Sequence, residues 1–219
     1  MVTKLYNLII LDRSGSMSTI INPTIAGVNE TLATIRMAQQ KTNIQQYVTL
    51  VSFCGCSTTT FCDNASINDV KEFTRKDYQP CCNTPLYDAI GEAVTKLKAQ
   101  VSKEEDSSVS VTIITDGYEN SSTEYTGPKV AKMIEALKEK GWTFNFIGAN
   151  IDVEKVSATL KIDNTMSWNS DEEGTKEMYS KFRSSYTTHM AEMVNEDADI
   201  PLATRIEERK KRSRRFFGK

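Results

Sequence analysis

A short apolar run that ends abruptly in polar residues constrains the fold of this chain more than any other segment. The run is Leu5–Leu11, in which Asn7 is the only strongly polar residue. A continuous apolar run of this length is typical of a strand that is covered on both faces, as in a parallel sheet. The sequence Asp12-Arg-Ser14-Gly-Ser16 follows directly. We therefore expect a buried strand whose carboxyl end carries one carboxylate and two hydroxyls on a tight loop.

Apolar runs alternate with amphipathic segments along the rest of the chain. Further strands are predicted at residues 47–53, 58–61, 109–114, 142–147 and 165–168. Helices are predicted to start at Asn22-Pro23, Thr84-Pro85 and Pro128, and to cover residues 153–160 and 173–195. Strands that alternate with helices predict an α/β fold, a Rossmann-like open and mostly parallel sheet with helices on both faces. Because residues 54–57 read as a tight hairpin, one edge strand should be antiparallel.

Length and charge limit the classes of protein to be considered. The chain has 219 residues, with 27 basic and 29 acidic side chains and a net charge of −2. This length suits one domain, which we expect at residues 1–197, followed by a linker and basic tail at 198–219. The near balance of charge gives no general argument for a nucleic-acid partner. With neither a signal-peptide pattern nor an apolar run of about 18 residues, no transmembrane segment is expected and a cytoplasmic location is predicted.

Oxygen ligands gather after two predicted strands and before one predicted helix. Asp12, Ser14 and Ser16 follow the first strand. Asp116 follows a later strand, and Thr84 opens a helix. In open α/β sheets, ligands bind outside the carboxyl ends of the strands, where the strand order reverses, so these loops are predicted to converge on one cation. Carboxylate and hydroxyl oxygens suit Mg²⁺ or another hard divalent cation, and the lack of His and Cys among them disfavours zinc.

The three motifs together resemble the metal-ion-dependent adhesion site of the von Willebrand factor A domain. The matching segments are Asp12-x-Ser14-x-Ser16, the Thr84 of Asn-Thr-Pro-Leu, and the Asp116 of Ile-Ile-Thr-Asp-Gly. All five positions carry the expected residue type in the expected order, and the resemblance covers about residues 1–195. Cys82 departs from the pattern, because many members of the family carry Gly before the threonine loop.

The resemblance implies a protein-binding module rather than an enzyme. It implies that Mg²⁺, or alternatively Mn²⁺ or Ca²⁺, is held by Asp12, Ser14, Ser16, Thr84 and Asp116. In this family the serine hydroxyls bind the ion directly, the threonine binds directly or through water, and the two aspartates supply most of the negative charge. An Asp or Glu carboxylate of a partner protein then completes the coordination shell. The chain is most similar to the small stand-alone bacterial members, some of which occur with tellurite-resistance and stress-response proteins.

The alternative is a Mg²⁺-dependent hydrolase that acts on phosphorylated substrates. Phosphatases of the haloacid dehalogenase type also place an Asp at a strand end, but they need a second acid two residues later, where this chain has Ser14. The P-loop motif is absent from the sequence. His189, the only histidine, lies beside the apolar stripe of the last predicted helix, so packing is its favoured role, and Glu119 is expected to be a solvated loop carboxylate. We therefore assign no catalytic residue.

Five cysteines, an odd number, lie around the predicted hairpin and before Thr84. They are Cys54, Cys56, Cys62, Cys81 and Cys82. In a cytoplasm they should be reduced, and small, partly buried thiols are the favoured interpretation. A soft-metal site made from four of them is one alternative, although the spacing lacks Cys-x-x-Cys pairs. The other alternative is a redox switch, in which oxidation at Cys81 or Cys82 moves the Thr84 loop.

The end of the chain is strongly basic. Residues 205–219 include Arg209-Lys-Lys-Arg-Ser-Arg-Arg215, followed by Phe216-Phe217. Clustered cations beside aromatic side chains are typical of segments that bind nucleic acid or an anionic membrane surface. We favour a solvated helical or disordered end that docks on an acidic partner or on a neighbouring subunit.

Overall fold

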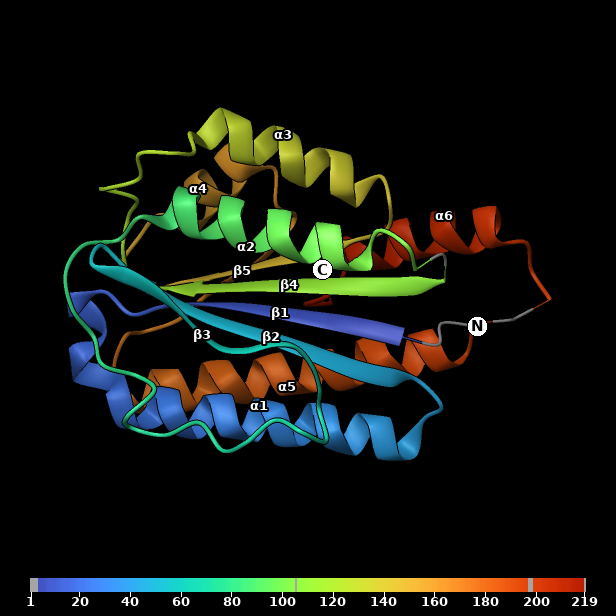
Figure 1. Ribbon diagram of the computed structural model, residues 1–219, viewed down its shortest axis with the longest axis horizontal. Helices are drawn as coiled ribbons and strands as arrows, with labels where there is room; N and C mark the ends of the chain where they lie inside the picture. The colour runs from blue at the N-terminus through green and yellow to red at the C-terminus, as the bar shows by residue number, and fades with distance from the viewer. Residues whose placement is uncertain (1–3, 105, 197–198, 219) are drawn as a thin grey trace.

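A single sheet forms the centre of the computed structural model (Figure 1). Over the residues that the structure describes, 4–104, 106–196 and 199–218, six strands pair in the order β3-β2-β1-β4-β5-β6. They are β1 (Lys4–Asp12), β2 (Gln45–Cys54), β3 (Ser57–Ser66), β4 (Ser107–Thr115), β5 (Thr143–Gly148) and β6 (Asn164–Ser167). Strand β3 runs antiparallel to β2, and the other neighbouring strands are parallel. The predicted mostly parallel sheet with one antiparallel edge strand is therefore confirmed.

Helices cover both faces of this sheet. They are η1 (Gly15–Ile20, a 3-10 helix), α1 (Ile21–Lys41), α2 (Leu86–Val101), α3 (Gly127–Lys138), α4 (Val153–Leu160), α5 (Glu172–Val194) and α6 (Leu202–Ser213). Helices α1 and α5 lie side by side on one face, whereas α2 and α3 lie on the other (Figure 1). The predicted starts at Pro23, Pro85 and Pro128 agree to within two residues, because proline is pre-organised for the first turn of a helix. None of the described helices is long and apolar enough to cross a membrane.

Each face of the sheet has its own apolar core, and the side chains of β1 alternate between the two cores. The core beneath α1 and α5 includes Leu5, Ile9 and Leu11. The core beneath α2 and α3 includes Leu8 and Ile10. Successive side chains of a strand point to opposite faces, so a strand that is covered on both sides needs an unbroken apolar run. This requirement accounts for the sequence of β1.

The polar residue Asn7 fits into β1 because its side-chain amide nitrogen donates two hydrogen bonds. Its amide nitrogen donates to Gln46 Oε1 at 3.0 Å and to the carbonyl oxygen of Tyr47 at 3.2 Å. From α5, the hydroxyl of Tyr186 donates to the same oxygen of Gln46 at 3.0 Å. Burying a polar group costs free energy unless it is hydrogen-bonded, so this network allows a polar side chain in the core.

Helix α6 packs on the protein through buried arginines. Arg209 is buried; it donates to Asp106, just before β4, at 2.6 Å and forms an ion pair with Glu196, just after α5. Arg205 donates to the other carboxylate oxygen of Asp106 at 2.7 Å. The expectation of a solvated basic end is therefore wrong for these two arginines, because they neutralise carboxylates from two other segments. The predicted domain boundary between residues 197 and 198 falls outside the described residues.

The residues that follow α6 pack beside β6 and α5. The backbone N–H of Phe216 donates to Asn164 Oδ1 at 2.9 Å, and the side-chain amide of Asn164 donates to the carbonyl oxygen of Ser213 at 2.5 Å. The buried ring of Phe216 lies 5.7 Å from the ring of Phe182 and 5.3 Å from that of His189, centroid to centroid. This aromatic residue of the basic tail thus belongs to the core rather than to a surface that binds nucleic acid.

Candidate metal centre

Two aspartates lie where the strand order of the sheet reverses, between β1 and β4. The chain builds β2 and β3 on one side of β1, and it builds β4, β5 and β6 on the other side. Asp12 is the last residue of β1, and Asp116 directly follows β4, which pairs with β1 in parallel. Crevices at such a reversal are the usual ligand-binding places of open α/β sheets. The carboxylates predicted from sequence therefore lie at one edge, on neighbouring strands.

Asp12 is completely buried and is held by donors on both carboxylate oxygens. The backbone N–H of Ser14 donates to Oδ1 at 2.6 Å, and the hydroxyl of Thr115 donates to Oδ2 at 2.6 Å. Burial raises the pKa of Asp12 to about 6, although the hydrogen bonds from Thr115 and Ser14 lower it. The structure thus orients this carboxylate in a place where its charge is costly.

Hydroxyl groups connect the loop after β1 to the loop after β4. The Oγ atoms of Ser14 and Ser16 lie 3.2 Å apart, and the hydroxyl of Ser16 donates to Asp116 Oδ1 at 2.5 Å. Ser170, before α5, donates to Asp116 Oδ2 at 3.4 Å. Burial also raises the pKa of Asp116. Ser16 is exposed whereas Ser14 is buried, so this cluster opens toward solvent on the Ser16 side.

Thr84 reaches the same place from the loop before α2. Its backbone N–H donates to Asn120 Oδ1 at 2.9 Å, and its carbonyl oxygen accepts from the backbone N–H of Asn120 at 3.2 Å. A Cβ atom on Gly117 would lie 3.2 Å from Thr84 Oγ1 and 3.9 Å from Asp12 Oδ2. The threonine hydroxyl and the buried carboxylate therefore border the same glycine, and all five predicted residues gather at one edge of the sheet.

The donor set fits a hard divalent cation. It consists of carboxylate and hydroxyl oxygens, which are the ligand atoms that Mg²⁺ and Mn²⁺ take in proteins. Among the described residues, neither Asp12 nor Asp116 forms an ion pair with a Lys or Arg side chain. Two desolvated carboxylates without a cationic partner are costly, and a bound cation removes that cost.

Several residues around the centre are missing from the sequence prediction. Thr115, Asn120 and Ser170 hold ligands in place, but a polar residue next to a ligand is too common to be noticed in one sequence. Glu119 is half-buried, and it accepts from the backbone N–H groups of Ser121 at 2.8 Å and Tyr87 at 2.9 Å. The expectation of a solvated carboxylate is wrong there, because Glu119 ties the loop after β4 to the start of α2.

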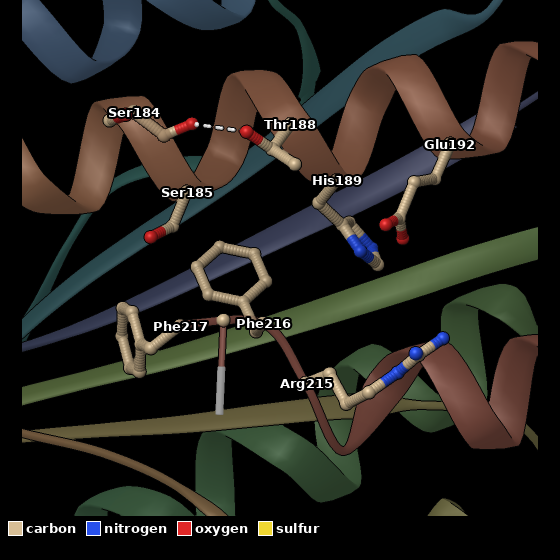
Figure 2. Close-up of a pocket in the computed structure, with 9 residues that line it drawn as sticks. Ser184, Ser185, Thr188, His189, Glu192, Arg215, Phe216 and Phe217 are labelled. Carbon is tan, nitrogen blue, oxygen red and sulfur yellow. Dashed lines mark hydrogen bonds between the residues drawn. The ribbon is translucent and has the colours of Figure 1, made fainter.

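A concave region lies between α5 and residues 215–218, away from the oxygen ligands (Figure 2). This cavity has a volume of about 430 Å³, and none of the five predicted ligands lines it. His189 does line it; burial, and then the charge of Arg212, lowers the pKa of His189 to about 4. A buried, neutral imidazole that packs against Phe216 matches the packing role expected from the sequence.

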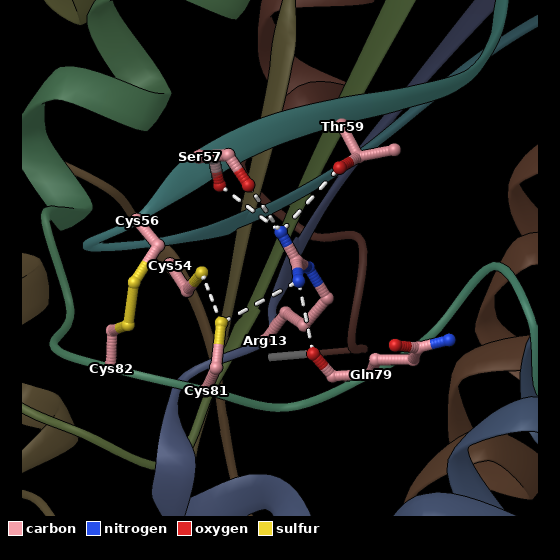
Figure 3. Close-up of a disulfide and its surroundings, with 8 residues drawn as sticks. All are labelled: Arg13, Cys54, Cys56, Ser57, Thr59, Gln79, Cys81 and Cys82. Carbon is pink, nitrogen blue, oxygen red and sulfur yellow. Dashed lines mark hydrogen bonds between the residues drawn. A yellow bond between two sulfur atoms is a disulfide. The ribbon is translucent and has the colours of Figure 1, made fainter.

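Four of the five cysteines form a group beside Arg13, and two of them, Cys81 and Cys82, lie on the loop that carries Thr84 (Figure 3). Cys56 and Cys82 form a disulfide, so the expectation of reduced thiols is wrong for this pair, while Cys54, Cys62 and Cys81 are free. Cys82 has a φ of +58°, in the left-handed region that favours glycine. The glycine that many von Willebrand factor A domains have here is thus replaced by a residue that pays a small conformational cost.

Comparisons with known proteins bear on the fold alone. No protein-family model matches the sequence, and no curated protein matches it. Several solved structures do match the fold, all at low sequence identity.

The first of these is proximal thread matrix protein 1 from the mussel byssus, with 14% identity and a TM-score of 0.54 over 81% of this chain and 44% of that one. The chain therefore spans less than half of the mussel protein. Manganese-loaded TRAP protein of Plasmodium vivax has 18% identity and a TM-score of 0.55 over 80% of this chain and 72% of that one. The SpRpn10 VWA domain has 11% identity and a TM-score of 0.57 over 80% of this chain and 93% of that one. This chain therefore has the fold of a von Willebrand factor A domain.

Proposed function

We propose that this protein is a metal-dependent protein-binding module. In this proposal Mg²⁺ or Mn²⁺ is held by Asp12, Ser14, Ser16, Thr84 and Asp116, with Ca²⁺ as a further candidate ion. The observation that carries the proposal is the convergence of two buried carboxylates, from the ends of β1 and β4, on the hydroxyls of one loop without an ion-pair partner among the described residues. The manganese-loaded state of a protein with the same fold supports the choice of ion.

Each residue has a distinct part in this site. The hydroxyl oxygens of Ser14 and Ser16 are ligands, and Asp12 and Asp116 balance the charge of the ion. Thr84 contributes its hydroxyl from the third loop. A bound hard cation supplies a coordination position that an outside oxygen ligand fills. The exposed Ser16 marks the side from which that ligand arrives.

The outside ligand that suits this position is an Asp or Glu carboxylate of a partner protein. A carboxylate gains a charge-assisted contact with the ion, and such contacts give specificity as well as affinity. Tyr118, two residues after Asp116, has 51% of its surface exposed, and its hydroxyl accepts a hydrogen bond from the backbone of Asp152 at 2.8 Å. An oriented, exposed tyrosine beside the site is a suitable anchor for a protein interface.

Metal titration tests the first half of this proposal. Calorimetric titration of EDTA-treated protein should give binding of Mg²⁺ and Mn²⁺ at micromolar to millimolar affinity. Asp116→Asn and Ser14→Ala should each weaken the affinity by at least about tenfold, since the first removes a charge that balances the ion and the second removes a proposed ligand oxygen. Ser18→Ala is the matched control, because Ser18 lies exposed on η1 and is not a proposed ligand. Equal affinity in wild type and both ligand variants contradicts the site.

Capture of a partner tests the second half. Immobilised wild-type protein should retain a partner in Mg²⁺, release it in EDTA, and fail to retain it as Asp116→Asn. A peptide array with acidic and amidated versions of the same peptides then tests the carboxylate requirement.

The hydrolase alternative predicts a different result. An enzyme would release phosphate from p-nitrophenyl phosphate in Mg²⁺ or Mn²⁺ and would lose that activity as Asp12→Asn. Such activity overturns the binding module. The cytoplasmic location inferred from the sequence stays a prediction.

A further inference from the structure

Four of the five cysteines meet at one point. The Sγ atoms of Cys54, Cys56, Cys81 and Cys82 all lie within 4.8 Å of one another (Figure 3). Cys54 is the last residue of β2 and Cys56 lies in the turn between β2 and β3, whereas Cys81 and Cys82 come from the loop before Thr84. Two loops that are far apart in sequence thus present two sulfur atoms each to a common centre.

The spacing of the sulfur atoms is close to that of a zinc site. Two thiolates on one tetrahedral Zn²⁺, with bonds of about 2.3 Å, lie about 3.8 Å apart. The sulfurs of Cys54 and Cys81 lie 2.8 Å apart, the sulfurs of Cys56 and Cys82 are bonded, and the widest pair lies within 4.8 Å. Some of the observed sulfur–sulfur separations are therefore shorter than the separation in a zinc site, and the upper limit is longer. Shifts on the order of 1 Å place the four sulfur atoms around one tetrahedral ion.

The surroundings of Cys54 favour its charged, thiolate form, whereas the hydrogen bond with Cys54 and burial raise the pKa of Cys81. The guanidinium of the buried Arg13 donates to Cys81 Sγ at 3.6 Å (Figure 3). Burial raises the pKa of Cys54, but hydrogen bonds from Cys81 and from the backbone of Cys56 and Ser57, together with the charge of Arg13, bring it below its ordinary value. The thiolate is the form that ligates metals, and backbone donors to sulfur are typical partners of metal-bound cysteines.

The backbone holds both cysteine loops before any ion binds. The N–H of Cys81 donates to the carbonyl oxygen of Arg13 at 2.9 Å, and the N–H of Gly15 donates to the carbonyl oxygen of Cys82 at 3.1 Å. The N–H of Gly55 donates to the carbonyl oxygen of Asn83 at 2.7 Å. These bonds join three loops, so a ligand set that spans them is pre-organised.

We propose that Cys54, Cys56, Cys81 and Cys82, in their reduced form, bind one Zn²⁺ in a closed tetrahedral site. With four protein ligands the site has no open position, so its role is structural rather than catalytic. The ion cross-links the β2–β3 turn to the loop that carries Thr84. The soft sulfur donors keep this site separate from the oxygen-donor centre, and the inference does not depend on the proposed function.

Metal content tests the proposal on the whole 219-residue chain. Protein that is reduced with a phosphine, supplied with Zn²⁺ and freed of loosely bound metal by EDTA dialysis should retain one zinc per chain by mass spectrometry. Cys54→Ser and Cys81→Ser should lose this zinc. Cys62→Ser is the matched control, because Cys62 lies in β3 outside the group, and Asp116→Asn should also retain its zinc.

Cobalt spectroscopy tests the ligand set without any variant. Reduced wild-type protein titrated with Co²⁺ should develop sulfur-to-metal charge-transfer bands and the intense visible bands of a tetrahedral tetrathiolate, and Zn²⁺ should abolish both. This readout remains valid where a serine variant fails to fold. The proposal is overturned if wild-type protein with Cys54, Cys56, Cys81 and Cys82 all reduced gains neither zinc nor these bands. It is also overturned if folded Cys81→Ser keeps the zinc content of wild type.

Discussion

The hydroxyl of Ser16 donates a 2.5 Å hydrogen bond to Asp116, which lies one hundred positions further along the chain. The two residues meet because β1 and β4 are parallel neighbours whose carboxyl ends coincide. Their contact is the shortest link between the two loops that straddle the reversal of strand order. The proposed metal centre is thus a product of sheet topology as much as of the residues themselves.

The first prediction concerns the stability cost of the oxygen site. Burial raises the pKa of Asp116, so its charged form is disfavoured at neutral pH and this penalty is relieved only as the pH falls below the folded pKa. Asp116→Asn in EDTA at pH 7 should therefore unfold at the same or a higher temperature than wild type. Wild type should gain more stability from Mg²⁺ than this variant does, with a gain of about 2.7 kcal/mol for wild type at a concentration one hundred times its Kd. Thermal unfolding with EDTA and with Mg²⁺ checks both statements, and a lower melting temperature for metal-free Asp116→Asn contradicts them.

A second prediction concerns Thr115, which touches a proposed ligand without being one. Its hydroxyl orients Asp12 at 2.6 Å, and Thr115→Val removes that donor while keeping the shape of the side chain. The affinity for Mn²⁺ should fall by about 10- to 100-fold, as is typical when a partner of a metal ligand is lost. Calorimetric titration measures the loss, with Thr112→Val, buried on the same strand, as control. An unchanged affinity would show that Asp12 needs no such support.

The packing of α1 on α5 gives a third prediction. A Cβ atom on Gly27 would lie 2.0 Å from the ring of Tyr179, a distance that no packing allows. Gly27→Ala should destabilise the protein by about 1–3 kcal/mol through overpacking, as measured by urea unfolding. The double variant with Tyr179→Ala should lose less than the sum of the single losses, because alanine lacks the γ-carbon and ring atoms that the methyl group would meet. Strict additivity argues against a clash at this contact.

A fourth prediction concerns the ion cluster of α6. The side chains of Arg209 and Glu196 are 5% and 4% exposed, so removing the arginine deletes buried charge-assisted hydrogen bonds to Glu196 and Asp106, while Arg205 and Arg212 still pair with these carboxylates. Arg209→Met should cost about 1.5–3 kcal/mol. Arg214→Met is the control, since Arg214 lies 3.9 Å from Glu139 with its side chain 57% exposed, and it should cost less than about 1 kcal/mol. Chemical denaturation of both variants compares them directly, and equal losses refute the structural role of α6.

The buried histidine sets a fifth prediction, on pH. Burial, followed by the charge of Arg212, lowers the pKa of His189 to about 4 from its ordinary value of 6.5. Between these two values the unfolded chain binds a proton that the folded chain does not, so this residue's contribution to stability is complete above pH 6.5 and falls as the pH drops toward 4. The loss amounts to at most about 3 kcal/mol, at 1.36 kcal/mol for each pH unit.

His189→Phe should remove this contribution to the pH dependence of stability, while the carboxyl groups of the protein keep theirs. The test is the difference in unfolding free energy between wild type and His189→Phe across this pH range, and a constant difference contradicts the prediction.

A feature of the fold or of the metal centre could be predicted from the sequence where the residues that define it lie within one short segment. The run Leu5–Leu11 with its Asp-x-Ser-x-Ser loop is readable because the periodicity and the ligands lie within one short segment. The hydrogen bond from Thr115 to Asp12 is not readable, since it depends on the register between two strands.

Helix α6 is the clearest difference between expectation and structure. Its basic composition is typical of a solvated segment, and only the distant Asp106 and Glu196 explain why two of its arginines are buried. The meeting of Cys54 and Cys56 with Cys81 and Cys82 likewise arises from the folding of two loops onto one another. Sequence spacing alone, without Cys-x-x-Cys pairs, argues against such a group.

Asp12 and Arg13 are adjacent in the chain, yet their side chains serve different neighbourhoods. Asp12 joins the hydroxyls at the end of β1, whereas Arg13 donates to Cys81 Sγ and to the carbonyl oxygen of Gln79. A single peptide unit therefore separates an oxygen-rich environment from a sulfur-rich one. If both proposals hold, divalent ions at this edge of the molecule should distribute by their polarisability, since hard ions prefer oxygen and softer ions prefer sulfur. The two types of donor atom would then distinguish the two metals without a protein barrier between the sites.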